Sequence, residues 1–234
     1  MASVILREGK TVPSIFAGGL DDMPTTMHRR LGAFRYDVFV GRLGWQLPGA
    51  DATSLTEWDQ FDRGRTIHVV SVNQAQRICG CTRLIPITQP YLLQTLCAPS
   101  AALDLPCAPT IWELSRFAAR CGVSPTTRAS TGMQLFPSIL AIAASLGATC
   151  VIGAMTRAVA RLYQHCGLAL QLVNTVENAG RPDYLIGAIE LSRSTFTNLG
   201  CDAHALLGSV TWLGARHARV GLSTLAPPPE TSDH

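Results

Sequence analysis

Trp112-Glu113-Leu114-Ser115-Arg116-Phe117 is the most informative stretch of this chain, because it sets two charged residues among large apolar ones. The apolar residues favour a partly buried β-strand over residues 111–117. Unpaired charges are costly in such surroundings and are kept mainly for pairing or for chemistry. We therefore expect Glu113 and Arg116 to lie in the wall of an active site.

Helical and strand patterns alternate on both sides of this stretch. Helices are expected at residues 24–43, 130–146 and 157–166. Further strands are expected at residues 67–72 and 77–84, which flank a polar turn, and at 148–155, 171–176 and 184–191. This order predicts an α/β (α+β) chain in which helices pack on a mixed β-sheet.

The length of the chain sets its domain organisation. With 234 residues, 47% of them hydrophobic, it can form one well-packed domain. We assign this domain to residues 1–200 and a C-terminal extension, with a partly disordered tail, to residues 201–234. Residues 1–23 contain several glycines and paired aspartates, so we expect them to be mobile.

Charge and cysteine content exclude several classes of partner. The net charge is only +3, and the basic residues are scattered, so nucleic acid is not expected to bind. The eight cysteines form no C-x-x-C pair, which favours reduced thiols in a cytoplasmic protein without a metal site. The start of the chain does not resemble a signal peptide. Residues 129–156 carry no charge, but Pro137 and Gly147 interrupt them, so we expect no membrane span.

Four further motifs precede the opening stretch, and the five together carry a resemblance. They are Arg35-Tyr36-Asp37-Val38-Phe39, Leu43-Gly44-Trp45, Asp59-Gln60-Phe61-Asp62 and Gly80-Cys81-Thr82-Arg83-Leu84-Ile85-Pro86. In order and spacing, the set resembles the acyl-homoserine-lactone synthases, the LuxI-type autoinducer synthases. The resemblance runs from about residue 30 to about residue 199.

The resemblance implies both a fold and a reaction. The fold would be that of the GNAT acyltransferases, a mixed central β-sheet with helices packed on both sides. The reaction would join S-adenosylmethionine to the acyl group of an acylated acyl carrier protein, giving an N-acyl-homoserine lactone and methylthioadenosine. S-adenosylmethionine is then a substrate, and no cofactor is implied. Acyl-CoA remains a possible donor.

The family's signature positions carry over one at a time. Glu113 and Arg116 match the acidic and the basic residue of its E-x-S-R motif, which are implied to be catalytic. The residues implied to bind S-adenosylmethionine are Arg35, Phe39, Trp45, Asp59, Asp62 and Arg83. Glu57, two residues before Asp59, receives no role.

Acyl transfer requires a neutral amine, and we expect Glu113 to accept its proton. An α-amino group has a pKa of about 7.7 to 8.0, so a weak base suffices near neutral pH. In a regular strand, however, Glu113 and Arg116 would point to opposite faces. The sequence therefore predicts a β-bulge near Leu114 or Ser115, which would bring both side chains to one site and leave a backbone N–H for the oxyanion.

The acyl chain and its carrier need surfaces of their own. We expect an apolar slot lined by Ser115, Phe117, Met155, Thr156 and Leu162. In this family a hydroxyl at the end of the buried strand is associated with 3-oxo substrates, which is the reason for including Thr156. A carrier protein is acidic, and the arginines predicted to dock it are Arg120, Arg128, Arg157 and Arg161.

Other interpretations stay open. Phe39 and Trp45 also fit core packing, Asp59 and Asp62 a turn, and Glu113 with Arg116 a structural ion pair. The chain also fits another GNAT-type N-acyltransferase that uses acyl-CoA, which would have no need of the aromatic and acidic motifs. A non-catalytic lipid- or nucleotide-binding module would explain the apolar slot but not the charged pair.

Overall fold

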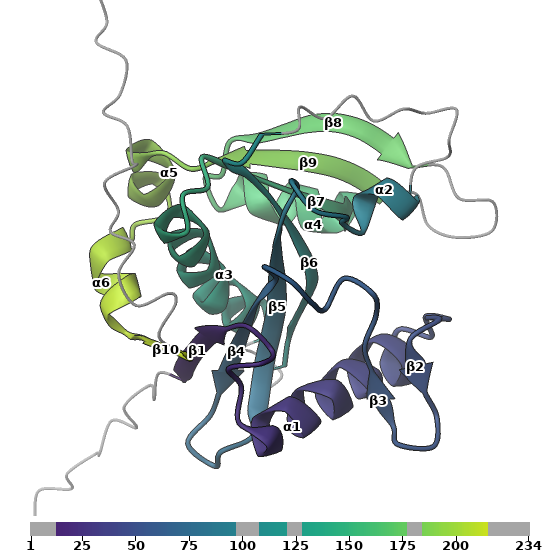
Figure 1. Ribbon diagram of the computed structural model, residues 1–234. Helices are drawn as coiled ribbons and strands as arrows, with labels where there is room; N and C mark the ends of the chain where they lie inside the picture. Colours follow the sequence, from purple (N-terminus) through teal and green to yellow (C-terminus); the bar gives the residue numbers. More distant parts are fainter. Residues whose placement is uncertain (1–12, 97–107, 121–127, 177–183, 215–234) are drawn as a thin grey trace, which may run out of the picture.

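A computed structural model describes residues 13–96, 108–120, 128–176 and 184–214 of the chain (Figure 1). Eight strands form one mixed sheet in the order β10-β1-β4-β5-β6-β7-β9-β8. The pairs β1–β10 and β6–β7 are parallel, and the other neighbours are antiparallel. The strands are β1 (Ser14–Gly18), β4 (Ile67–Val72), β5 (Ile78–Pro86), β6 (Ile111–Ala119), β7 (Cys150–Thr156), β8 (Leu170–Val176), β9 (Tyr184–Glu190) and β10 (Val210–Trp212).

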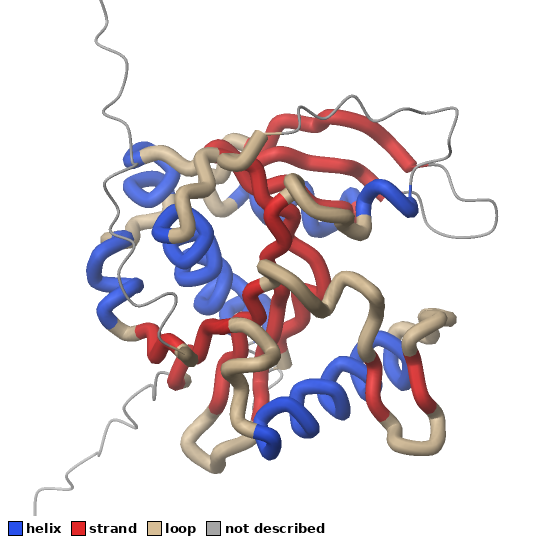
Figure 2. Tube along the Cα trace, viewed as in Figure 1, coloured by secondary structure: helices blue, strands red, loops and turns tan. Residues whose placement is uncertain are grey.

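Helices cover both faces of this sheet, as the fold class predicts (Figure 2). A short hairpin, β2 (Ala50–Asp51) and β3 (Thr56–Glu57), pairs outside the main sheet. The helices are α1 (Thr25–Arg35), which continues as the π-helical segment η1 (Tyr36–Arg42), α2 (Leu93–Leu96), α3 (Arg128–Ser145), α4 (Arg157–His165), α5 (Arg193–Asn198) and α6 (Ala203–Gly208).

Strand alternation divides the core into two layers. On β4, Val69 packs in the cluster formed with α3, whereas Val70 packs in the cluster formed with α1, and both side chains are fully buried. Because both faces of the central strands are covered, β4 and β5 read as nearly continuous apolar runs. The predicted hairpin of β4 and β5 is present, closed by the N–H of Asn73 donating to the carbonyl of Arg77.

The sheet opens between β6 and β7. These two parallel strands pair only from Ile111 to Glu113 on one side and from Cys150 to Ile152 on the other. Both strands continue well beyond those residues, so they separate just where the motif of Glu113 to Phe117 begins. The active-site candidate therefore lies at an opening in the sheet.

Both ends of the described chain join the sheet, which corrects two expectations. Ser14–Gly18 were expected to be mobile, yet they form β1, and Ala17 is fully buried between β4 and β10. The boundary predicted after residue 200 separates nothing in the described part, because β10 pairs with β1 and Ala203 of α6 packs in the α3 cluster. Within the described residues, no helix is both long and apolar enough to cross a bilayer.

Candidate active site

A β-bulge in β6 brings the two charged residues of the motif to one face. Pairing with β5 is regular from Trp112 to Ser115, so the predicted position at Leu114 or Ser115 is wrong. The register instead shifts between Ser115, opposite Arg83, and Ala118, opposite Cys81, and Arg116 adopts a left-handed φ of 54°. Two residues of β6, Arg116 and Phe117, thus lie opposite one residue of β5, Thr82.

The bulge places Glu113 and Arg116 on one face of the sheet, as predicted from the sequence. Phe117 joins Trp112 in the layer that packs on α3, although a regular strand would have put them on opposite faces. Glu113 and Arg116 then line the same cavity on the other face. Side chains of β5 satisfy the carbonyls freed by the bulge: Thr82 Oγ1 donates to Ser115 and the Cys81 thiol donates to Arg116.

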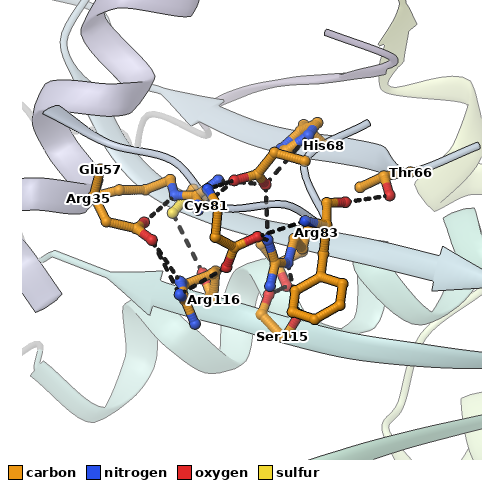
Figure 3. A network of polar contacts seen from close by, with 12 residues as sticks. Arg35, Glu57, Thr66, His68, Cys81, Arg83, Ser115 and Arg116 are labelled. Carbon is orange, nitrogen blue, oxygen red and sulfur yellow. Dashed lines mark hydrogen bonds and ion pairs between the residues drawn. The ribbon is translucent and has the colours of Figure 1, made fainter. Parts of the chain in front are cut away.

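Beneath that cavity lies a buried network of arginines and carboxylates (Figure 3). Arg35, at the end of α1, donates from Nη1 and Nη2 to the two oxygens of Asp62 at 2.8 and 2.9 Å. Its Nε donates to Oε2 of Glu57 at 2.6 Å. The side chains of Arg35 and Glu57 are 1% and 0% exposed, so both charges depend on these partners.

The other two arginines complete the network. Arg83 donates to Asp59, to Asp62 and, through Nε, to Oγ of Ser115. Arg116 donates to Oε1 of Glu57 at 3.0 Å and to Oδ2 of Asp59 at 2.8 Å. Three guanidinium groups thus face three carboxylates, and the network is balanced in charge. Burial lowers the pKa of the adjacent His68 to about 3, so this imidazole adds no charge at neutral pH.

Glu113 stands apart from the network and is held by the backbone. It is 0% exposed, and its Oε2 accepts a hydrogen bond of 2.7 Å from the N–H of Leu93 in α2. Its Oε1 has no hydrogen-bond partner among the residues that the structure describes. Burial raises the pKa of Glu113 above its ordinary value, against the opposing effect of the Leu93 N–H. Such a carboxylate is a better base than an exposed one.

Two cavities meet beside these residues. The first, of about 640 Å³, is bounded by the loop from Leu43 to Gly49, by Asp59 and Phe61, and by α2. The second, of about 480 Å³, runs over the opened strands toward α3 and α4. Residues that line both are Leu43, Trp45, Leu114, Ser115, Arg116, Ala154 and Tyr184. A reaction between groups held in the two cavities would take place at this junction.

The residues predicted to bind S-adenosylmethionine divide into two groups. Trp45 and Asp59 line the first cavity, and Phe39 stacks on Trp45 at 5.1 Å from within the second. Arg35, Asp62 and Arg83 line neither cavity and lie behind it, in the network that holds Asp59 and Arg116, which do. Glu57, to which the sequence gave no role, is thus a central member of the network.

Four of the five residues predicted to form the acyl slot line the same cavity. Ser115, Phe117, Met155 and Thr156 line the second cavity. Leu162 does not, because its side chain is 37% exposed on the outer side of α4, and the next residue, Tyr163, points inward in its place. Helical periodicity alone could not tell which of the two neighbours faces the sheet. The Thr156 hydroxyl also accepts from the N–H of Val159 and caps α4.

The predicted docking arginines do not form one patch. Arg157 and Arg161 are exposed on α4. Arg120 lies on the opposite face of the sheet, where it pairs with Asp37 and stands over the ring of Phe34. The side chain of Arg128 falls outside the described residues.

The opened mixed sheet, with a buried carboxylate and an apolar cavity at the opening, defines an acyltransferase fold of the GNAT type. Comparison with known proteins agrees: residues 21–199 match the model of the autoinducer synthases. The chain belongs to this family, and it is accordingly an acyltransferase of the acyl-homoserine-lactone synthase type.

Individual relatives extend over most of the chain. An acyl-homoserine-lactone synthase of Ralstonia solanacearum is 38% identical over 191 residues, which cover 79% of this chain and 92% of that relative. The crystal structure of TofI in a ternary complex with an inhibitor and MTA aligns with a TM-score of 0.67 at 32% identity, over 82% of this chain and 99% of TofI. BjaI, described as CoA-dependent and solved with SAM and isopentyl-CoA, aligns with the same TM-score at 19% identity, over 87% of this chain and 95% of BjaI, and shows the fold alone.

Proposed function

We propose that this protein makes an N-acyl-homoserine lactone from S-adenosylmethionine and an acylated acyl carrier protein. The observation that carries the proposal is Glu113, a fully buried carboxylate at the cavity where the sheet opens, with one oxygen that has no hydrogen-bond partner among the described residues. A buried carboxylate without a cationic partner is costly, so its retention favours a role as a base.

The first cavity suits S-adenosylmethionine. Trp45 and Phe61 offer aromatic faces for the adenine or for the sulfonium, by stacking or by a cation–π attraction of about 0.5 to 2 kcal/mol. Asp59 offers an acceptor for the α-amino group, and Arg116 a donor for the carboxylate. Arg35, Asp62 and Arg83 act behind them, because their ion pairs fix Asp59 and Arg116 in place.

Acylation begins when the α-amino group gives a proton to Glu113, directly or through a water molecule. The neutral nitrogen attacks the thioester carbonyl, the C–N bond forms, and the C–S bond breaks. The thiolate of the carrier leaves with the electron pair and takes up the second proton, which the nitrogen loses as the amide forms. Because neutralising the amine at pH 7 costs only about 1 kcal/mol, a carboxylate base is sufficient.

Lactone closure needs no further base. A carboxylate oxygen of the acylated intermediate attacks the γ-carbon while the bond from that carbon to the sulfonium breaks. The sulfur keeps the electron pair, so neutral methylthioadenosine departs and the charges cancel. The protein contributes by holding the carboxylate in line with the leaving group.

The acyl chain occupies the second cavity, with its thioester at the junction. Phe117, Met155 and Tyr163 provide apolar walls there. An acidic carrier protein would dock near this cavity at Arg157 and Arg161, which are exposed on α4 while Tyr163 of the same helix lines it. The similarity in fold to BjaI, a CoA-dependent enzyme, favours acyl-CoA as the second candidate donor.

One experiment tests the reaction and the donor together. The purified protein is incubated with S-adenosylmethionine and matched sets of acylated carrier proteins and acyl-CoAs, and products are identified by mass. We expect equimolar lactone and methylthioadenosine with a carrier-bound donor. Lactone from acyl-CoA alone would overturn the carrier assignment, and no lactone from any donor would overturn the function.

A further inference from the structure

In the described part of the chain, one backbone donor holds Glu113, the N–H of Leu93. The hydrogen bond to Oε2 is 2.7 Å long and wholly buried, since Leu93 is 1% exposed and Glu113 is 0% exposed. Leu93 is the first residue of α2, where a helix has no carbonyl of its own to receive the N–H. The donor is therefore free to serve another element, here β6.

This contact makes the two oxygens of Glu113 unequal. Oε2 is occupied by the Leu93 N–H, whereas Oε1 has no hydrogen-bond partner in the described part of the chain. A backbone donor cannot rotate away as a side chain can. Holding one oxygen therefore fixes the plane of the carboxylate and the direction of the other oxygen.

The same segment forms a wall of the first cavity. Leu92, Leu93, Thr95 and Leu96 line it opposite the loop that carries Trp45. The segment is anchored beneath by an apolar cluster that includes Phe61, Ile85 and Tyr91. One short, well-packed element thus encloses the cavity and holds the base.

We propose that the peptide N–H of Leu93 is a positioning group for Glu113, holding Oε2 so that Oε1 is the oxygen that takes the substrate's proton. This rests on the proposed function, in which Glu113 is the base. The group acts through the carboxylate and touches no reacting atom itself.

The contact also has an electrostatic effect. Burial raises the pKa of Glu113, while the Leu93 N–H opposes that rise by favouring the charged form. The other groups acting on this carboxylate are the neighbouring hydroxyl of Ser115 and Arg83 on β5, which lower its pKa, and Asp59 in the loop before β4, which raises it. Removing the N–H leaves all three in place, so the pKa of Glu113 should rise further.

Two variants remove the N–H and one control retains it. Leu93→Pro deletes the donor at the first helical position, where the fixed φ of proline is tolerated. Replacing Leu93 by its α-hydroxy acid, which turns the amide into an ester, deletes the same donor and keeps the whole side chain. Leu93→Ala removes most of the buried side chain but keeps the N–H.

The measurement is the pH dependence of kcat/KM, whose acidic limb reports the pKa of the base in the free enzyme. We expect this limb to move upward by about 1 pH unit in the proline and ester variants, because a hydrogen bond to a charged group is lost. The limb of Leu93→Ala should stay at the wild-type pH. If the proline variant does not fold, the acidic limb of the ester variant alone tests the role of the Leu93 N–H.

An unmoved limb in the ester variant would overturn the proposal, and so would an equal movement in Leu93→Ala, which would assign the effect to packing. Glu113→Gln separates this failure from that of the proposed function. If Glu113→Gln retains wild-type turnover, Glu113 is not the base. If it loses turnover while the ester variant keeps the wild-type limb, only the role of Leu93 fails.

Discussion

Glu57 holds Arg116 in its unusual backbone conformation. Oε1 of Glu57 accepts from Nη2 of Arg116 at 3.0 Å, while Oε2 of the same carboxylate accepts from Nε of Arg35 at 2.6 Å. Arg116 has a φ of 54°, a backbone conformation that residues other than glycine rarely adopt. The cost of this conformation at the bulge is offset by the buried ion pairs of the arginine. Glu57 thus connects α1 to β6, although Arg116 lies 59 residues further along the chain than Glu57.

We predict that Glu57→Gln destabilises the protein by about 3–5 kcal/mol, because Arg35 and Arg116 lose one buried counter-charge. Turnover should fall about tenfold or more, since the wall of the cavity shifts when Arg116 is released. Urea unfolding and kcat check the two effects.

A matched control removes an exposed ion pair instead. Asp37 pairs with Arg120, and their side chains are 52% and 35% exposed. Asp37→Asn should therefore cost less than about 1 kcal/mol and leave kcat unchanged. Equal losses of stability in Glu57→Gln and Asp37→Asn would mean that burial does not determine how much these ion pairs stabilise the fold.

The sequence predicts those parts of the site that lie in recognisable motifs, and not those that depend on the tertiary arrangement. Arg83, Asp59 and Asp62 were predicted because the motifs that contain them match those of the acyl-homoserine-lactone synthases in order and spacing. Glu57 ends β3, two residues before Asp59, and its role depends on the fold of the β2–β3 hairpin, which hydrophobic periodicity does not predict. The need for a bulge followed from strand alternation, whereas its place depends on which residue of β5 lies opposite, which is tertiary information.

Backbone groups were beyond the reach of side-chain patterns altogether. The Leu93 N–H has no signature in the sequence, and any residue except proline would supply it. The strand Ser14–Gly18 was missed for a related reason. It is five residues long, ends in glycine, and becomes buried only because β4 and β10 pair on both sides of it.

Asp62 gives the protein a defined sensitivity to acid. Burial alone would raise its pKa, but the charge and hydrogen bonds of Arg35, with the charge of Arg83, hold the pKa well below its usual range. An aspartate with a lowered folded-state pKa stabilises the fold above its unfolded pKa, about 3.9, and this stability is lost as the pH falls below that value. Asp62→Asn should cost about 3–5 kcal/mol at pH 7.

The pH dependence of that cost is the check. Urea unfolding of wild type and Asp62→Asn at pH 7, 5, 4 and 3 should give a constant difference down to about pH 5. The difference should then shrink as the unfolded state takes up its proton. A difference independent of pH would show that Asp62 contributes through packing and not through its charge.

Glu113 should behave in the opposite sense. Burial raises its pKa in the folded state, so its charge destabilises the fold. The favourable contribution of the protonated form is fully present below the unfolded pKa of about 4.3 and is lost as the pH rises through the folded value. Glu113→Gln should therefore have a higher Tm than wild type at pH 7, with the gain vanishing near pH 4. A lower Tm at pH 7 would mean that the charge is stabilised by its surroundings.

The aromatic end of the second cavity should limit the length of the acyl chain. Phe136 stacks on Tyr163 at 4.4 Å and meets Phe117 edge-on at 5.6 Å, and all three rings line this cavity. Tyr163→Ala removes the ring that α4 contributes and should extend the space. We predict that kcat/KM shifts toward longer donors, by about tenfold for each methylene newly accommodated.

Gly187 allows the opposite change in the same cavity. A Cβ at this position would lie 2.6 Å from Leu170 and 2.9 Å from Met155, both side-chain atoms, so Gly187→Ala pushes the Met155 end into the space. The preferred donor should become shorter. Leu162→Ala is the control, because Leu162 is next to Tyr163 but faces solvent. Product profiles by mass across a series of acyl chain lengths distinguish the three variants. Equal profiles for Tyr163→Ala and wild type would place the end of the acyl chain elsewhere.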